Sequence, residues 1–88
     1  MNYIETLKGK FVITEQGRNQ IRSLLAWKGL ALLSLTLDTG WNYQKLYRVI
    51  RGLQTISKDE FDKLDNCLFM LTGYRLTDTD SHLIGRVS

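Results

Sequence analysis

The stretch that decides the fold is residues 29–52, which read GLALLSLTLDTGWNYQKLYRVIRG. Its first half is short and apolar, and Gly40 then supplies a residue suited to a sharp turn. Asn42 belongs to the residue types that open helices, and Gly52 to those that stop them. The pattern predicts a helix over 30–39, a turn, and a second helix over 42–51, which is the plan of a helix-turn-helix.

The second of these helices separates into an apolar and a polar face. Leu46, Val49 and Ile50 recur at helical spacing and form the expected buried stripe. Trp41 precedes the cap and is expected to pack inward on Leu46. The other positions carry hydrogen-bonding and cationic side chains without any acid: Tyr43, Gln44, Lys45, Tyr47, Arg48 and Arg51. A face of this composition suits contact with the phosphates and base edges of DNA.

The first helix of the pair is apolar around more than half of its circumference. Leu30, Leu33 and Leu37 share one stripe, whereas Leu32 and Leu35 lie to either side of it. One core face does not account for so much apolar surface. Either neighbouring elements enclose this helix, or Leu32 or Leu37 is exposed and meets another protein.

A third helix is expected on the N-terminal side of this pair, over residues 15–28. Thr14 is a suitable N-cap for it, and Gly29 is a suitable C-terminal stop. Helical spacing places four of its residues on one stripe: Ile21, Leu24, Leu25 and Lys28.

A fourth helix is expected after Ser57, because Glu60 stands three residues later and completes a capping box. This helix should run to about Leu71 and end at Gly73. Its core stripe is Phe61, Leu64, Cys67, Leu68 and Leu71. Cys67 is the only cysteine, so no internal disulfide can form, and its leucine neighbours favour a packed thiol over a reactive one.

The two ends of the chain carry less periodic patterns. Residues 1–14 form an N-terminal arm, which fits two short strands around Gly9, a first helical turn over 2–8, or one strand over 10–13 pairing with 83–87. Residues 15–73 form the helix-turn-helix domain, and 74–88 form a polar C-terminal tail. The expected fold is mainly α, a small helical bundle with short strands allowed only in the arm and the tail.

Composition and charge limit the classes of function. The 88 residues suffice for one domain, hold no apolar run long enough to cross a membrane and begin with a segment too polar for a signal peptide, so we expect a soluble cytoplasmic protein. One cysteine and one histidine, His82, supply neither a zinc site nor a nucleophile with its base, so we expect no enzyme activity, metal or cofactor. Residues 1–57 carry eight Lys and Arg against three Asp and Glu, whereas 58–88 carry four against six. The basic front half suits a partner that bears phosphates.

Ten residues follow one another at a fixed spacing through the helix pair: Gly29, Leu30, Leu35, Thr36, Gly40, Trp41, Asn42, Leu46, Val49 and Gly52. With Ser57 and the leucines of the fourth helix, this spacing resembles that of the phage Cro and lambda-repressor-like helix-turn-helix family. The match covers about half of the chain. It departs from the family at Leu32, Thr36 and Ile50, where glutamine, alanine and glutamate are frequent.

The resemblance implies a DNA-binding regulator of the phage or bacterial kind. It implies that the residues three, four, five and eight places after the turn glycine contact base edges or adjacent phosphates: Tyr43, Gln44, Lys45 and Arg48. The chemistry agrees, since Gln can bind adenine with two hydrogen bonds, and Lys and Arg can donate to guanine or phosphate. Phosphate contacts are expected around them from Lys28, Asn42, Tyr47, Arg51, Gln54 and Thr55.

The sequence therefore predicts a sequence-specific transcriptional regulator, a repressor, that binds double-stranded DNA as a homodimer on an inverted repeat. The alternative is a protein-binding inhibitor or antitoxin-like adaptor. Such a protein would keep the fold and grip its partner with Leu32 and Leu37.

Overall fold

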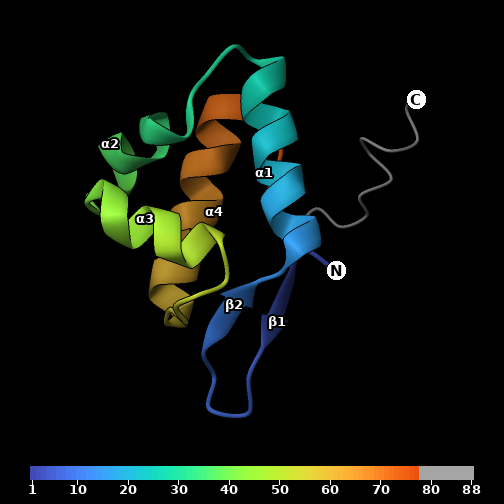
Figure 1. Ribbon diagram of the computed structural model, residues 1–88, viewed down its shortest axis with the longest axis vertical. Coiled ribbons are helices and arrows are strands. Elements are labelled where there is room, and N and C mark those ends of the chain that lie inside the picture. The colour runs from blue at the N-terminus through green and yellow to red at the C-terminus, as the bar shows by residue number, and fades with distance from the viewer. Residues whose placement is uncertain (78–88) are drawn as a thin grey trace.

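Four α-helices and one antiparallel hairpin build the part of the chain that the computed structural model describes, residues 1–77 (Figure 1). Along the chain the elements are β1 (Tyr3–Glu5), β2 (Phe11–Ile13), α1 (Glu15–Trp27), a 3-10 turn η1 (Leu32–Ser34), α2 (Leu35–Thr39), α3 (Tyr43–Ile50) and α4 (Lys58–Thr72). This is a mainly α architecture, as expected. The expectations for His82 and for a strand over 83–87 lie outside the described residues. Within residues 1–77, no helix is both long and apolar enough to cross a bilayer.

The N-terminal arm is a β-hairpin, so two short strands around Gly9 is the correct choice for this segment and a helical turn over 2–8 is wrong. Tyr3 pairs with Ile13, and the strands run antiparallel. Phe11 also exchanges two backbone hydrogen bonds with Ile56, at 2.7 and 2.9 Å, which ties the hairpin to the segment before α4. Because Phe11 and Ile13 are both buried, the hairpin contributes directly to the core.

Helix α1 begins where the sequence predicts and ends one residue early. The Thr14 hydroxyl accepts a hydrogen bond from the backbone N–H of Gly17 at 3.1 Å, the expected N-cap. Three of the four residues of the predicted stripe are buried: Ile21, Leu24 and Leu25. Lys28 is exposed instead, because the helix closes at Trp27 and the lysine stands on the turn that follows, its ammonium 4.7 Å from the Trp27 ring centroid.

The expected helix over 30–39 is wrong in its start, and of the two alternatives for its apolar surface the exposure of Leu37 is the correct one. A 3-10 turn occupies Leu32–Ser34 and the α-helix begins only at Leu35. The 3-10 repeat of three residues per turn brings Leu32 and Leu35 to the same side, where Leu35 is fully buried and Leu32 packs partly against the core. The residues predicted for the stripe, Leu33 and Leu37, are 57% and 81% exposed.

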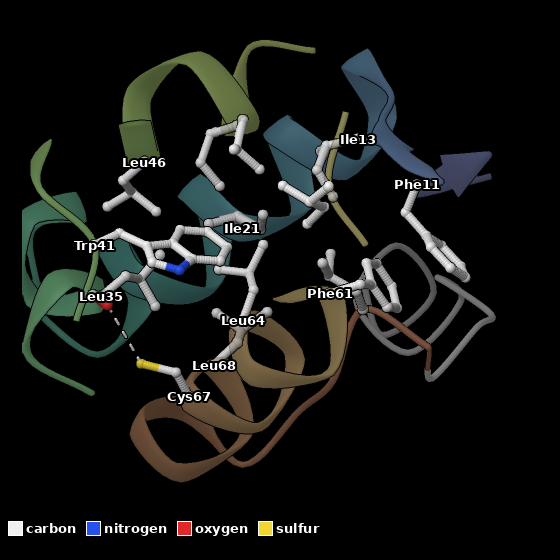
Figure 2. Close-up of a cluster of buried hydrophobic side chains, with 14 of the residues drawn as sticks. Phe11, Ile13, Ile21, Leu35, Trp41, Leu46, Phe61, Leu64, Cys67 and Leu68 are labelled. Carbon is white, nitrogen blue, oxygen red and sulfur yellow. Dashed lines mark hydrogen bonds between the residues drawn. The ribbon is translucent and has the colours of Figure 1, made fainter. Parts of the chain in front are cut away.

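Helix α4 lies between α1 on one side and α2 and α3 on the other (Figure 1). It opens with the predicted capping box between Ser57 and Glu60 and ends at Gly73. Four of its five predicted core residues are buried: Phe61, Leu64, Cys67 and Leu68. The fifth, Leu71, is partly buried and packs against the core. The buried residues of α4 face the core, and Figure 2 shows Trp41 lying between Leu46 and Leu35, pointing inward as predicted.

The start of the C-terminal tail also belongs to the core. Leu76 is completely buried, and its backbone N–H donates to Asp65 Oδ1 at 2.6 Å. Its carbonyl accepts a hydrogen bond at 3.1 Å from Nδ2 of Asn2, a buried residue of the opposite end of the chain. The first residues of the chain and the residues after α4 are therefore joined across α4.

Candidate nucleic-acid interface

Helix α3 is fixed in place by its buried side and by both of its ends. Leu46, Val49 and Ile50 are buried as the sequence predicts. At the N-terminus, Oδ1 of Asn42 accepts a hydrogen bond from the backbone N–H of Lys45 at 2.7 Å. The short α2 leads into α3 through a left-handed residue, Gly40, with φ of 75°.

The C-terminal end of α3 lies against the hairpin. Gly52 has φ of 75°, and a Cβ atom at this position would stand only 2.8 Å from the backbone oxygen of Ile13. Only glycine accommodates both the left-handed backbone and this close approach. The last turn of α3 and strand β2 are therefore in direct contact.

Tyrosine and arginine side chains form a row along the exposed side of α3. The Tyr43 and Tyr47 rings stack with centroids 6.1 Å apart, and the two side chains are 46% and 37% exposed. Arg51 continues the row, donating from Nη1 to the Tyr47 hydroxyl at 2.7 Å with its guanidinium 5.3 Å from the ring centroid. The contacts hold Arg51 extended along the helix while it remains exposed.

Gln44 and Arg48 are the open polar groups of this helix. Both are exposed, and neither makes a side-chain hydrogen bond or ion pair with any residue in 1–77. Since α3 contains no acid, nothing on the helix itself neutralises Arg48. These two side chains have the hydrogen-bonding capacity needed to read a base edge.

Lys45 does not stand on the open part of this face. Its ammonium lies 2.5 Å from Oε2 of Glu60 on α4 and 4.9 Å from the Trp41 ring centroid, and its side chain is 28% exposed. The hydrogen bond from Lys45, together with the backbone N–H of Ser57, holds the pKa of Glu60 below its ordinary value. Helix α3 itself carries no acid, as expected, but Glu60 of the following helix places one beside Lys45.

The structure places some of the predicted phosphate-contacting residues beside α3 and others away from it. Asn42 uses its side-chain oxygen in the cap, which leaves its amide NH₂ as a donor. Thr55 is exposed and Gln54 partly buried in the loop that follows α3. Lys28 directly follows the last residue of α1. Figure 1 shows that this C-terminal end of α1 lies away from α3.

The predicted protein interface is exposed in part. Leu37 projects from α2, whereas Leu32 is half-buried against the core. Leu33, which was not among the leucines proposed for this interface, is the second exposed leucine of this segment.

The one cysteine of the chain has a structural role in the core. Cys67 is buried, its Sγ 3.7 Å from the carbonyl oxygen of Leu35 (Figure 2), and burial together with the nearby Asp38 raises the pKa of its thiol. A raised pKa keeps the sulfur protonated and unreactive. In residues 1–77, no three His, Cys, Asp or Glu side chains are grouped so that they could hold a metal ion.

Comparison with protein-family models, with curated proteins and with solved structures gave no match to this chain.

Proposed function

We propose that this protein is a sequence-specific, double-stranded-DNA-binding transcriptional regulator, a repressor, that inserts α3 into the major groove. The observation that carries the proposal is the exposed row of α3, in which Tyr43, Tyr47 and Arg51 are pre-ordered beside the open side chains Gln44 and Arg48. An α-helix fits the major groove of B-form DNA, and these side chains are donors without a competing acid on the same helix.

The chemistry of the row divides into reading and anchoring. Gln44 offers an amide that can pair with adenine, and Arg48 a fork of N–H groups that matches guanine. Arg51 and the NH₂ group of Asn42 stand at opposite ends of α3, where contacts to phosphates would fix the helix in register. Tyr43 supplies a ring for a thymine methyl or a hydroxyl for a phosphate. Lys45, held by Glu60, contributes charge near the groove and not a free base contact.

The proposal includes a homodimer on an inverted repeat. A single α3 covers only a few base pairs, so one protomer offers little affinity and little sequence information. Two protomers related by a two-fold axis would place their α3 helices one DNA turn apart, about 34 Å. The recovered DNA should then contain two half-sites in opposite orientation.

The test is enrichment of bound duplexes from a randomised library, followed by fluorescence-anisotropy titrations of the recovered site at several salt concentrations. We expect an inverted repeat to be selected. Arg48→Ala and Gln44→Ala should each lower the preference for one base pair by about 1–3 kcal/mol, roughly fivefold to a hundredfold. Arg51→Ala should weaken all sequences alike and reduce the salt slope by about 0.9.

Arg22→Ala is the matched control, because it removes the same charge from an exposed position of α1. It should leave base preference unchanged and affect affinity much less than Arg51→Ala. Failure of the wild-type protein to retain any duplex at low salt would overturn the proposal. Equal losses from Arg48→Ala, Gln44→Ala and Arg51→Ala on every sequence would remove base reading and leave general DNA binding.

A protein-binding adaptor is the second candidate, and the exposure of Leu37 and Leu33 on neighbouring turns favours it. In this case the leucines, and not α3, would determine activity. Leu37→Ser would then abolish binding of a protein partner while the Arg48→Ala variant binds normally. If the protein instead reads DNA with α3, Arg48→Ala should impair its binding and Leu37→Ser should not.

A further inference from the structure

The turn between β1 and β2 is an ordered structure at the end of a projecting hairpin. The Thr6 hydroxyl accepts hydrogen bonds from the backbone N–H groups of Lys8 and Lys10, at 3.3 and 3.1 Å. The backbone N–H of Thr6 donates to the Lys10 carbonyl at 2.7 Å, and Gly9 takes a left-handed conformation with φ of 75°. These bonds fix the direction in which the side chains of the tip point.

The tip presents one apolar and two cationic side chains to solvent. Leu7 is as exposed as in an extended chain, at 106%, so it contributes nothing to the core. Lys8 and Lys10 are exposed on the two sides of Gly9 and have no ion-pair partner within residues 1–77. Glu5, at the end of β1, is the one acid of the hairpin. An apolar side chain flanked by cations is the combination that proteins insert into the minor groove of DNA.

The hairpin is held rigidly beside the C-terminal end of α3. Gly52 approaches the Ile13 oxygen closely, and Phe11 is hydrogen-bonded to Ile56 in both directions, so α3 and β2 share a fixed relation. Figure 1 shows the hairpin extending away from the helices from this junction. The register pairs Glu5 with Phe11, so Leu7 stands opposite Gly9, one step beyond Lys10. At a rise of about 3.3 Å per residue, Lys10 stands roughly 10 Å beyond Ile13 and Leu7 roughly 13 Å.

This reach is comparable with the spacing of the grooves in DNA. One turn of the duplex spans about 34 Å, so the centre of a minor groove lies roughly 17 Å from the centre of the adjacent major groove. The tip backbone lies roughly 10–13 Å from Ile13, beside the end of α3, and the side chains of Leu7, Lys8 and Lys10 extend its reach toward that separation. Charge is complementary as well, since Lys8 and Lys10 would meet the phosphates that border the groove.

We infer that the hairpin tip is a second DNA-binding element, which enters the minor groove next to the major groove occupied by α3. Lys8 and Lys10 bind the bordering phosphates, and Leu7 packs against the sugars and base edges in the groove. The inference rests on the proposed function, because it requires the same duplex. It extends the contacted site beyond the bases that α3 can reach.

The experiment compares the full-length protein with Lys8→Ala/Lys10→Ala on the duplex selected by the wild type. Loss of two phosphate contacts should lower the slope of log affinity against log salt by about 1.8 per protomer, which is a roughly tenfold smaller loss of affinity between 50 and 200 mM salt. Hydroxyl-radical cleavage should increase at the sugars of the flanking minor groove. Base preference within the region read by α3 should not change.

Arg22→Ala/Lys63→Ala is the charge-matched control, since it removes two exposed cations from α1 and α4. It should leave both the flanking cleavage pattern and most of the salt slope unchanged. Leu7→Ala should restore cleavage in the flank without changing the salt slope, because it removes no charge. All five positions are exposed and outside the core, so these variants keep the fold.

The outcomes separate the inference from the proposed function. If the wild type binds a selected duplex but the Lys8→Ala/Lys10→Ala variant keeps its salt slope and its flanking protection, the hairpin has no role and α3 alone binds DNA. If the wild type binds no duplex, the proposed function fails and the hairpin inference fails with it.

Discussion

Gly17 stands in the first turn of α1, where that helix passes against the backbone of Asn2. A Cβ atom at this position would lie 2.0 Å from the Asn2 oxygen and 2.8 Å from its carbonyl carbon. The same oxygen accepts a hydrogen bond from the backbone N–H of Thr14 at 3.1 Å. The clash therefore involves backbone on both sides and cannot be relieved by turning a side chain.

We expect Gly17→Ala to destabilise the protein, although alanine is ordinarily the better helix former. Helix propensity alone would favour alanine by about 1 kcal/mol. Forcing extra volume into a packed contact costs about 1–3 kcal/mol, and here it must also displace the first residues of the chain. The sign of the change in urea unfolding free energy decides which effect is larger. Asn19→Ala, at an exposed position of the same helix, should be neutral or slightly stabilising.

At the scale of elements, the contact between Lys45 and Glu60 joins α3 to α4. Glu60 serves two purposes, since its Oε1 accepts the backbone N–H of Ser57 at 3.1 Å while its Oε2 binds the Lys45 ammonium. Both contacts favour the charged carboxylate and lower its pKa in the folded state from the ordinary value of 4.5. The unfolded chain therefore binds more protons than the folded one around this pH.

The Glu60 contribution to stability should consequently be complete above about pH 4.5 and be lost as the pH falls through the lowered pKa. Glu60→Gln retains a residue that completes capping boxes and removes the charge, so it isolates the ion pair. We expect the variant to lose at most about 1 kcal/mol at pH 7, because both side chains are partly exposed, and this loss to shrink as the pH falls through the lowered pKa. Urea unfolding at several pH values measures this difference.

Asp59→Asn removes an acid from the same turn of α4, but Asp59 has no ion-pair partner within residues 1–77. Its effect should be smaller than that of Glu60→Gln. A Glu60→Gln loss that stays the same size at every pH through the acid range would mean that the ion pair does not stabilise the fold.

The starts of α1, α3 and α4 show which features a sequence determines locally. The N-caps Thr14, Asn42 and Ser57 were predictable because each cap bonds to a backbone N–H only three residues away. The pairing of Lys45 with Glu60 was not, because it depends on how α3 and α4 sit against each other. The capping-box pattern identified Glu60 but gave no sign of its second partner.

The sequence also did not show whether residues 32–34 form a 3-10 turn or part of an α-helix. In a segment of five leucines within eight residues, a 3-10 and an α repeat both bury some leucines, and tertiary packing of Leu32 and Leu35 decides between them. In the candidate site, the outward-facing residues of α3 could be predicted, because they are the positions left over once the buried stripe is assigned. Its internal order, with Arg51 bonded to Tyr47, could not be read from spacing alone.

At the level of the whole described fold, the first residues of the chain meet the segment that follows α4. Leu76 follows the last helix in a stretch without periodicity, so nothing in the local sequence indicates burial. Its side chain is nevertheless fully enclosed, and its backbone is bonded to Asp65 on one side and to Asn2 on the other. Asp65 is itself 4% exposed and also accepts a hydrogen bond from the Thr77 hydroxyl at 3.0 Å.

We expect Leu76→Ala to cost about 2–5 kcal/mol of unfolding free energy, since it removes a buried side chain and leaves a cavity. Small domains have about 5–15 kcal/mol in total, so the loss is a large share. Leu53→Ala, at a leucine that is 69% exposed, should change stability by at most about 0.5 kcal/mol. Hydrogen exchange adds a readout of the closure: the amides of Leu76 and Thr14, whose acceptors lie on Asp65 and Asn2, should lose protection together. If only the Leu76 amide became exposed, the two ends would be separate attachments, and the hairpin would keep its position on α3 without help from the C-terminal segment.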